Sequence, residues 1–294
     1  MREVAVLDRP HVLVDFLTLA KPELTFLSML TSVAGFLLGT AGPVNAVTLT
    51  ALLIGTALVG GGAGALNQYL ERDLDGLMRR TMHRPLPSGR LSSGTVLGAG
   101  GLMSIAGVLV LLTGTNALTA VLAACTLALY LLAYTPMKRI SLAATFVGAI
   151  PGALPPLIGW TAATNGFGTP GWLLFVVLFL WQLPHFWSLA SLYRKDYARA
   201  GYRLLPVMDP TGRTTGLAIL ASCLGLTLLP LGLVEPAGLG GPSIFGTVGA
   251  GIIFTAIAAG HLRSLTSASA RRVFVASLFY LPPVLLIYVL DRFL

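Results

Sequence analysis

Residues 46–85 read AVTLTALLIGTALVGGGAGALNQYLERDLDGLMRRTMHRP, an apolar stretch that passes directly into a segment rich in acidic, amide and basic side chains. The apolar part, residues 46–70, is long enough for a membrane-spanning helix, which needs about 20 mostly apolar residues. A polar or ionisable side chain inside such a helix is costly, and it marks a functional site more often than a structural one. The stretch therefore predicts a spanning helix with a site at one end.

Composition extends this prediction to the whole chain. Of 294 residues, 55% are hydrophobic and only 10% charged, whereas about 25% are charged in an average soluble domain. Nine apolar stretches have the length of a membrane span: 24–41, 46–70, 92–113, 116–134, 141–162, 171–193, 214–233, 245–262 and 270–292. We predict an all-α polytopic membrane protein, a bundle of nine transmembrane helices in the lipid bilayer.

The basic residues fall in alternate loops, as expected when Lys and Arg mark the cytoplasmic side. They precede the first span and follow the second, fourth, sixth and eighth: Arg2, Arg9, Lys21, Arg72, Arg79, Arg80, Arg84, Arg90, Lys138, Arg139, Arg194, Lys195, Arg199, Arg203, Arg213, Arg263, Arg271 and Arg272. Only Arg292 falls on the other side. We expect a cytoplasmic N-terminal segment, residues 1–23, an external C-terminus and a prokaryotic plasma (inner) membrane. The net charge of +8 then reflects topology, and nucleic acid is not an expected partner.

Three oxygen-bearing side chains follow one another at the end of the second span. Asn67, Glu71 and Asp75 are spaced by four residues, so on a continuing helix they share one face. Amide and carboxylate oxygens suit Mg²⁺, which is often held by one or two carboxylates together with phosphate oxygens of a substrate. The cluster that follows could pair with the remaining phosphate charge; it consists of Arg79, Arg80, Arg84 and Arg90. The alternative is a solvated helix end with mixed charges.

The sixth span ends in the same way, with Trp181 and His185 inside it and Lys195 and Asp196 after it. Two such ends could face one pocket. His185 alone could equally be a hydrogen-bonded core histidine, because no second ligand at metal spacing accompanies it. After the fourth span, Tyr134-Thr135-Pro136-Met137-Lys138-Arg139 brings two more cations to the same side, either for orientation or to bind phosphate.

Prolines interrupt two of the predicted spans. Pro151, Pro155 and Pro156 lie in the fifth span, and Pro282 and Pro283 lie in the ninth. Each proline frees a backbone carbonyl that neighbouring helices or a cavity must satisfy. This pattern makes a central cavity plausible.

Taken together, these segments resemble the UbiA-type intramembrane prenyltransferases, and within them the branch that acts on heme. The resemblance covers most of the chain. It rests on Lys21-Pro22; Asn67, Glu71 and Asp75 with Met78, Arg80-Thr81 and Arg84-Pro85; Tyr134-Thr135 with Lys138-Arg139; Pro155-Pro156-Leu157-Ile158-Gly159-Trp160; Trp181-Gln182 with Pro184-His185-Phe186; and Asp196-Tyr197 with Ala200-Gly201.

The resemblance implies a single transmembrane prenyltransferase domain, residues 1–294, whose nine helices enclose a central cavity. It implies transfer of a farnesyl group from farnesyl diphosphate to a vinyl group of protoheme IX (heme B), with Mg²⁺ as cofactor and the diphosphate at the cytoplasmic end. A downstream heme-modifying enzyme could accept the product. The sequence departs from the family at Glu71, where aspartate is usual, and at Ala200, where a second acid is usual; the latter leaves the number of metal ions open.

We assign roles to the matching residues on this basis. Asn67, Glu71, Asp75 and Asp196 are the expected metal ligands. Arg80, Arg84, Lys138, Arg139 and Lys195 are expected to hold the diphosphate. His185, Trp181 and Tyr134 are expected to contact the acceptor, and Asn67, Glu71, Asp75, Lys195 and Asp196 form the expected catalytic set.

Two other functions remain open from the sequence. A prenyltransferase of the same fold could act on an aromatic quinone precursor such as 4-hydroxybenzoate. A multipass transporter could also use intramembrane acids and broken helices, although the chain has no convincing internal repeat. A scaffold without chemistry would explain the spans and not the acidic ladder.

Overall fold

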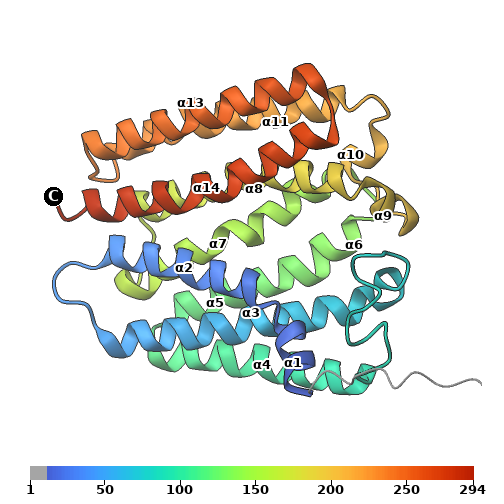
Figure 1. The fold of residues 1–294 in the computed structure, drawn as a ribbon. Coiled ribbons are helices and arrows are strands. Elements are labelled where there is room, and N and C mark those ends of the chain that lie inside the picture. Colours follow the sequence, from blue (N-terminus) through green and yellow to red (C-terminus); the bar gives the residue numbers. More distant parts are fainter. Residues whose placement is uncertain (1–11) are drawn as a thin grey trace, which may run out of the picture.

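The computed structural model describes residues 12–294, and the regular elements in that range are all helices (Figure 1). They are α1 (Val12–Ala20), α2 (Pro22–Gly39), α3 (Ala46–Asp75), α4 (Ser93–Gly114), α5 (Ala117–Ala128), the π-helix η1 (Leu129–Tyr134), α6 (Thr135–Met137), α7 (Ala144–Thr164), α8 (Thr169–Leu192), α9 (Arg194–Arg199), α10 (Leu205–Met208), α11 (Arg213–Leu228), α12 (Leu231–Val234), α13 (Gly241–Ser264) and α14 (Ser267–Asp291). Part of the predicted N-terminal segment, 1–23, lies outside this range, and residues 12–20 of it form α1.

Within the described residues, nine helical segments are long and apolar enough to cross a membrane. They coincide with the nine predicted spans to within a few residues at each end, so the prediction of a nine-span helical protein is confirmed. The largest difference is at the second span, because α3 continues to Asp75 and carries the acidic ladder on regular helix. The fourth span is built from α5, η1 and α6 in succession.

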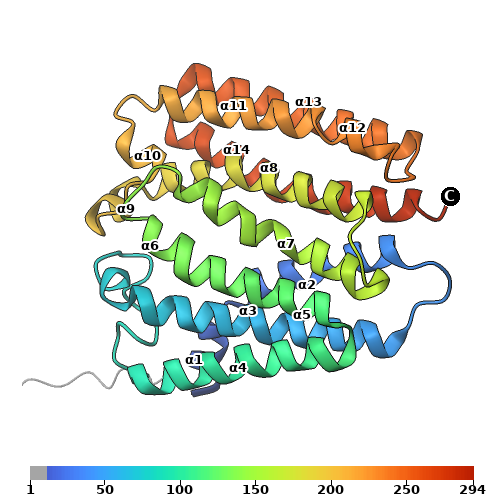
Figure 2. The ribbon, with the colours of Figure 1, turned by 180° about the vertical axis from the view of Figure 1, so that it is seen from behind.

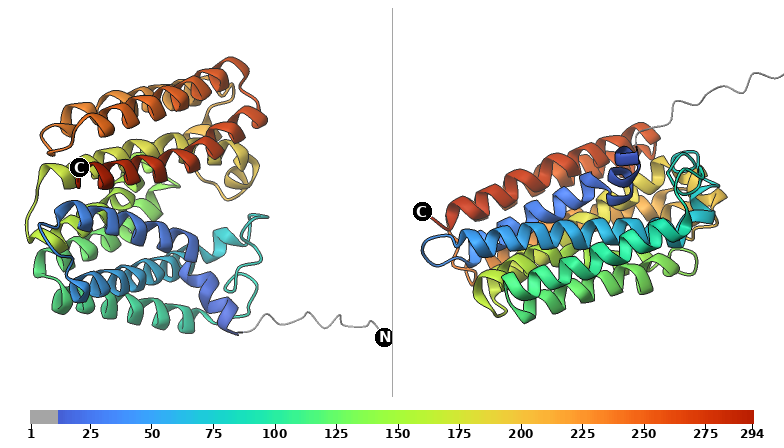
Figure 3. Two further views of the ribbon diagram at one scale, coloured as in Figure 1. Left: turned by 60° about the vertical axis from the view of Figure 1, so that its left-hand side comes forward. Right: turned by 90° about the horizontal axis from the view of Figure 1, so that it is seen from below.

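The long helices lie side by side, roughly parallel or antiparallel (Figures 1 and 2). α3 packs on α4, α2 on α7, α7 on α8, and α13 on both α11 and α14. The residue 76–92 loop, α1, α6, α9 and α10 gather at one end of the bundle, which we call the polar end, and the C-terminus lies at the other (Figure 3). The connections after the second, fourth and sixth spans therefore meet.

The prolines do not break their helices, contrary to the expected interruption. α7 runs unbroken through Pro151, Pro155 and Pro156, and α14 runs through Pro282 and Pro283. The hydroxyl of Ser32 on α2 donates to the carbonyl of Pro155 at 2.9 Å, so α2 lies directly against the proline-containing part of α7. α2 and α7 pack closely along this stretch, and the partners of the carbonyls that the prolines free stay a prediction.

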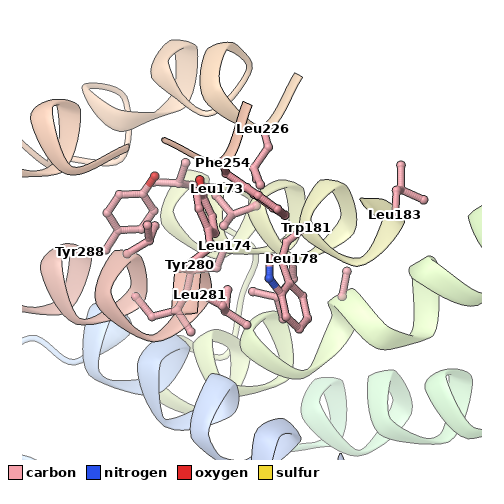
Figure 4. Packing of buried hydrophobic residues seen from close by; sticks show 14 of the residues in the cluster. Leu173, Leu174, Leu178, Trp181, Leu183, Leu226, Phe254, Tyr280, Leu281 and Tyr288 are labelled. Atoms are coloured by element: carbon pink, nitrogen blue, oxygen red, sulfur yellow. The ribbon is translucent and has the colours of Figure 1, made fainter. Parts of the chain in front are cut away.

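The largest apolar cluster lies between α8, α11, α13 and α14 (Figure 4). Leu174, Leu226 and Tyr288 are fully buried there, and Trp181 donates its indole N–H to the carbonyl of Ser277 at 2.7 Å. Closely packed, buried side chains resist rearrangement. This half of the bundle therefore holds α8, and with it Trp181 and His185, in a fixed position.

Candidate active site

The acidic ladder is buried at the polar end of α3. Asn67, Glu71 and Asp75 are 1%, 5% and 1% exposed, and the amide of Asn67 donates to Glu71 Oε2 at 3.0 Å. Because the three residues recur every four positions on an unbroken helix, they face the same way, as predicted. Two carboxylates that are this deeply buried need partners, since an uncompensated buried charge is strongly destabilising.

Cations from two other segments supply those partners. Lys138 Nζ lies 2.7 Å from Glu71 Oε1, and Arg84 Nη1 lies 2.7 Å from Asp75 Oδ2. The phenol of Tyr202 also donates to Glu71 Oε1 at 2.9 Å. The connections after the second, fourth and sixth spans thus converge on one carboxylate pair.

Lys21 completes the cluster from the short link between α1 and α2. Its ammonium donates to Asn67 Oδ1 at 2.7 Å. Its backbone is left-handed, with φ of 47°, a conformation that costs about 1–2 kcal/mol for a residue other than glycine. Such strain is found most often at functional sites.

Burial and neighbouring charges set the proton affinities of this cluster. Burial, together with the positive charges of Arg84 and Lys138, lowers the pKa of Lys21 to about 7. Burial also acts to lower the pKa of Lys138, but Tyr134 and Glu71 outweigh it and hold that pKa well above its ordinary value. Lys138 is therefore a permanent cation, whereas Lys21 can lose its proton near neutral pH.

The cluster suits an anion that carries several charges. With Lys21 protonated, three cations (Lys21, Arg84 and Lys138) face two carboxylates, an excess of one positive charge. A diphosphate would draw these donors to its oxygens, since charge-assisted hydrogen bonds to phosphate are among the strongest in proteins. When Arg84 and Lys138 turn from the carboxylates to the diphosphate, Glu71 and Asp75 become free to bind a metal ion.

The donor set fits a Mg²⁺ ion that binds together with phosphate. Glu71 and Asp75 offer two carboxylates on one helix face, and Asn67 offers an amide oxygen. Within residues 12–294, no group of three or more His, Cys, Asp or Glu side chains could hold a metal ion. Mg²⁺ is commonly bound through one or two carboxylates plus the phosphates of its substrate, so the missing ligands are those a diphosphate provides.

A pocket of about 280 Å³ opens beside the cluster. Lys21 and Tyr134 line its polar end, and Trp181 and His185 line it from α8; the rest of the lining comes from α2, α3, α5, η1 and α7. The other large helices, α4, α11, α13 and α14, contribute no lining residue. A cavity enclosed at the centre of the whole bundle therefore stays a prediction.

His185 faces this pocket with one ring nitrogen already in use. Its Nδ1 lies 2.8 Å from the hydroxyl of Ser277 on α14, and its ring stacks on Trp181 with centroids 5.0 Å apart. Phe274 lies against the ring at 4.9 Å. The environment fixes the imidazole, and Nε2 is the nitrogen that a ligand in the pocket could meet.

The second motif, Lys195-Asp196, lies on α9. The side chain of Asp196 lies 3.4 Å from Arg199, its neighbour on α9, and no hydrogen bond or ion pair joins it to Glu71 or Asp75 in the described part of the chain. Lys195 is exposed. The predicted roles of Asp196 in metal binding and of Lys195 in phosphate binding remain predictions.

Arg80 and Arg139, the two exposed arginines among the expected diphosphate-binding residues, differ in their surroundings. Arg80 lies over the rings of Tyr193 and Tyr197, at 5.3 and 5.9 Å from their centroids, and donates to the Tyr197 hydroxyl at 3.4 Å. This contact ties the residue 76–92 loop to α9. Arg139 is exposed, and within residues 12–294 its side chain forms no ion pair or hydrogen bond.

Sequence reasoning missed two members of the cluster. Lys21 looks like a residue that sets orientation, because it directly precedes a span, and Tyr202 follows the second motif without any distinguishing neighbour. A signal existed for Lys21: Lys21-Pro22 belongs to the segments on which the family resemblance rests. For Tyr202 no such signal existed, because its contact with Glu71 joins residues 131 positions apart.

The comparisons with known proteins identify the family of this chain. The model of the UbiA prenyltransferase family matches residues 28–281, and the chain belongs to that family, a class of membrane-embedded prenyltransferases. Among curated relatives, the protoheme IX farnesyltransferase of Solibacter usitatus is 43% identical over 95% of this chain and 98% of its own length. The protoheme IX farnesyltransferase of Salinibacter ruber is 43% identical over 95% of this chain and 99% of its own.

The fold is also that of a solved UbiA homolog from Archaeoglobus fulgidus, whose structure contains DMAPP and Mg²⁺. The two chains superpose with a TM-score of 0.65 at 14% identity, over 93% of this chain and 99% of the other. The prediction of a UbiA-type helical bundle is therefore confirmed.

Proposed function

We propose that this protein transfers the farnesyl group of farnesyl diphosphate to a vinyl group of protoheme IX (heme B), with Mg²⁺ as cofactor. The observation that carries the proposal is the polar cluster at the mouth of the pocket, where Lys21, Arg84 and Lys138 surround Glu71 and Asp75. The names of its full-length relatives support heme as acceptor. They do not favour the aromatic acceptor or the transporter that the sequence left open.

The reaction begins when the allylic C–O bond breaks and pyrophosphate departs with the bonding electrons. Lys21, Arg84 and Lys138 stabilise the charge that grows on the leaving oxygens, the main electrostatic task of such a site. Mg²⁺, held by Glu71 and Asp75, would supply further charge neutralisation. The heme vinyl group then attacks the farnesyl cation to form a C–C bond, and the new cation on the former vinyl carbon takes up water and loses a proton.

The pocket walls suit the intermediate cation. Tyr130 and Tyr134 line the pocket next to the polar cluster, and Lys138 Nζ already lies 4.6 Å from the centroid of the Tyr134 ring. Aromatic faces attract cations, so a carbocation formed nearby would meet the same stabilisation. The remaining, mostly apolar lining keeps water away until the acceptor has reacted.

A single assay tests the proposal. The purified protein is incubated with farnesyl diphosphate, Mg²⁺ and either heme B or 4-hydroxybenzoate, and the products are identified by mass. We expect hydroxyethylfarnesyl heme and no prenylated benzoate. Prenylated benzoate alone would assign the protein to the quinone branch, and intact substrates in every mixture would argue against any prenyltransferase activity.

Placement in the membrane is part of the same proposal. All 294 residues act as one transmembrane domain in a prokaryotic plasma membrane, with the polar end and residues 1–23 in the cytoplasm and the C-terminus outside. Lys and Arg follow the even-numbered spans and favour this orientation. A downstream heme-modifying enzyme would receive the product at this membrane.

Topology can be tested with single cysteines. One is placed at an exposed position of the residue 76–92 loop and one near Asn165, in a background without Cys125 and Cys223. In sealed right-side-out vesicles an impermeant thiol reagent should label only the cysteine near Asn165, because the loop faces the interior. Labelling of both from the same side would contradict the nine-span topology.

His185→Ala should weaken heme binding, followed by the heme absorption spectrum, while Mg²⁺-dependent binding of farnesyl diphosphate stays near normal. Imidazole is a common heme ligand, and Nε2 is the ring nitrogen that Ser277 leaves available. Ser277→Ala is the matched control, since it keeps the ring and removes only its support. Unchanged heme binding in His185→Ala would return His185 to the role of a core residue.

Diphosphate binding should weaken as the pH rises above 7. In the free protein the pKa of Lys21 is lowered to about 7, so the anion must restore a proton that the lysine has lost at higher pH. Affinity would then fall by up to about tenfold per pH unit, measured by calorimetry from pH 7.5 to 9. Lys21→Arg should remove this dependence because arginine stays charged; an equally steep fall in that variant would exclude Lys21 as its origin.

A further inference from the structure

The pocket beside the polar cluster ends at a similar depth on four of the helices that line it, α2, α3, α7 and α8. On α2 the lining runs from Lys21 to Thr31, on α3 from Gly64 to Thr56, on α7 from Gly148 to Ile158, and on α8 from Phe186 to Leu178. At 1.5 Å per residue these stretches are about 12 to 15 Å long. Four separate helices thus define one floor.

The floor consists of Thr31, Thr56, Ile158 and Leu178, and closely packed side chains lie beneath it. One helical turn deeper on the same four helices are Ala34, Leu52, Ala162 and Leu174, which are 6%, 0%, 7% and 0% exposed. These belong to the two largest apolar clusters of the bundle. Because packed interiors yield little, the pocket cannot lengthen without displacing core residues.

The depth matches one prenyl chain length. The twelve-carbon main chain of an extended farnesyl group is about 14 Å long, taking an advance of roughly 1.25 Å for each carbon–carbon bond of about 1.5 Å. With its diphosphate at Lys21, the tail would end on the floor. A geranyl chain would stop about 5 Å short, and a geranylgeranyl chain would overrun by about 5 Å on the same measure.

We infer that Thr31, Thr56, Ile158 and Leu178 form a length gauge that selects a fifteen-carbon prenyl diphosphate over its ten- and twenty-carbon homologues. The inference rests on the proposed function in placing the diphosphate at the polar cluster. His185 and Phe186 lie at the upper end of the α8 lining, so the deep part of the pocket is left to the donor chain.

Thr56 offers the sharpest variants. Its hydroxyl is buried and finds no hydrogen-bond partner among residues 12–294, so Thr56→Val keeps the shape of the floor and removes only an unpaired polar group. Thr56→Phe raises the floor by about the length of one ring, whereas Ile158→Ala lowers it by up to three carbon atoms. The three substitutions therefore separate depth from polarity.

The experiment measures kcat/KM with heme for geranyl, farnesyl and geranylgeranyl diphosphate, and the affinity of their unreactive thio-diphosphate analogues with Mg²⁺ and no heme. We expect the wild type and Thr56→Val to favour the farnesyl compound by about tenfold or more. Thr56→Phe should shift preference towards geranyl, and Ile158→Ala towards geranylgeranyl, each by about tenfold, in both turnover and binding.

The outcomes separate this inference from the proposed function. If the wild type turns over farnesyl diphosphate but all variants keep its length preference, the gauge is wrong and the function stands. If no heme product forms but analogue binding follows the floor, the gauge stands and the acceptor is wrong. Thermal unfolding shows whether each variant folds. If Thr56→Phe fails to fold it is replaced by Thr56→Leu, and Ile158→Ala is replaced by Ile158→Val. These milder variants should shift the chain-length preference in the same directions by a smaller factor, and an unchanged preference overturns the gauge.

Discussion

Asp75→Asn should reduce turnover by about a hundredfold or more while leaving expression and membrane insertion intact. The carboxylate of Asp75 is 1% exposed and lies 2.7 Å from Arg84, and with Glu71 it is one of the two acids of the buried cluster that we expect to hold Mg²⁺ against the diphosphate. Asparagine keeps the shape and removes the charge. Loss of one preorganised electrostatic partner commonly costs about 10²–10³ in rate.

The same helix supplies a matched control for this substitution. Asp73 is two residues away, its side chain is 88% exposed, and its contact with Arg72 is 3.8 Å long. Asp73→Asn removes the same charge from the same helix end without touching the cluster, and its rate should stay within about twofold of wild type, since an exposed pair contributes little. Equal rates for both variants at limiting Mg²⁺ would favour the solvated helix end.

Lys138→Met should lower both activity and stability, by about a hundredfold in rate and by about 3 kcal/mol in the free energy of unfolding. Lys138 and Glu71 form a buried ion pair, with side chains only 11% and 7% exposed. Removal of the lysine leaves the Glu71 charge without its nearest counterion. We take the lower end of the usual range because Tyr202 and Asn67 still hydrogen-bond to that carboxylate.

Arg139→Met is the control, because Arg139 is adjacent in sequence and exposed. Thermal unfolding in detergent and turnover are measured for both variants. If turnover and stability fall in Lys138→Met and not in Arg139→Met, Lys138 acts in the site, beyond the role in membrane orientation that both cations share. An equal loss in Arg139→Met would restore the predicted role of Arg139 at the diphosphate.

Local patterns accounted for much of the fold and part of the site. The nine spans followed from hydrophobic length, because about 20 mostly apolar residues are what a helix needs to cross the hydrocarbon core of a bilayer. The four-residue spacing of Asn67, Glu71 and Asp75 determined that they share a face, since helical geometry is the same in every context. Arg84 was predicted to hold the diphosphate; it forms an ion pair with Asp75, and its role at the diphosphate stays a prediction.

Tertiary structure decided which of the other charges belong to the site. Lys138 and Arg139 are neighbours in sequence, yet one is buried against Glu71 and the other faces outward, because the turn after α6 points successive side chains in different directions. Lys21 and Tyr202 reach Asn67 and Glu71 from distant parts of the chain. The sequence determined the membrane bundle and its acidic ladder because both depend on local periodicity, whereas the cations, the tyrosine and the pocket floor depend on how separate helices pack, which no local pattern records.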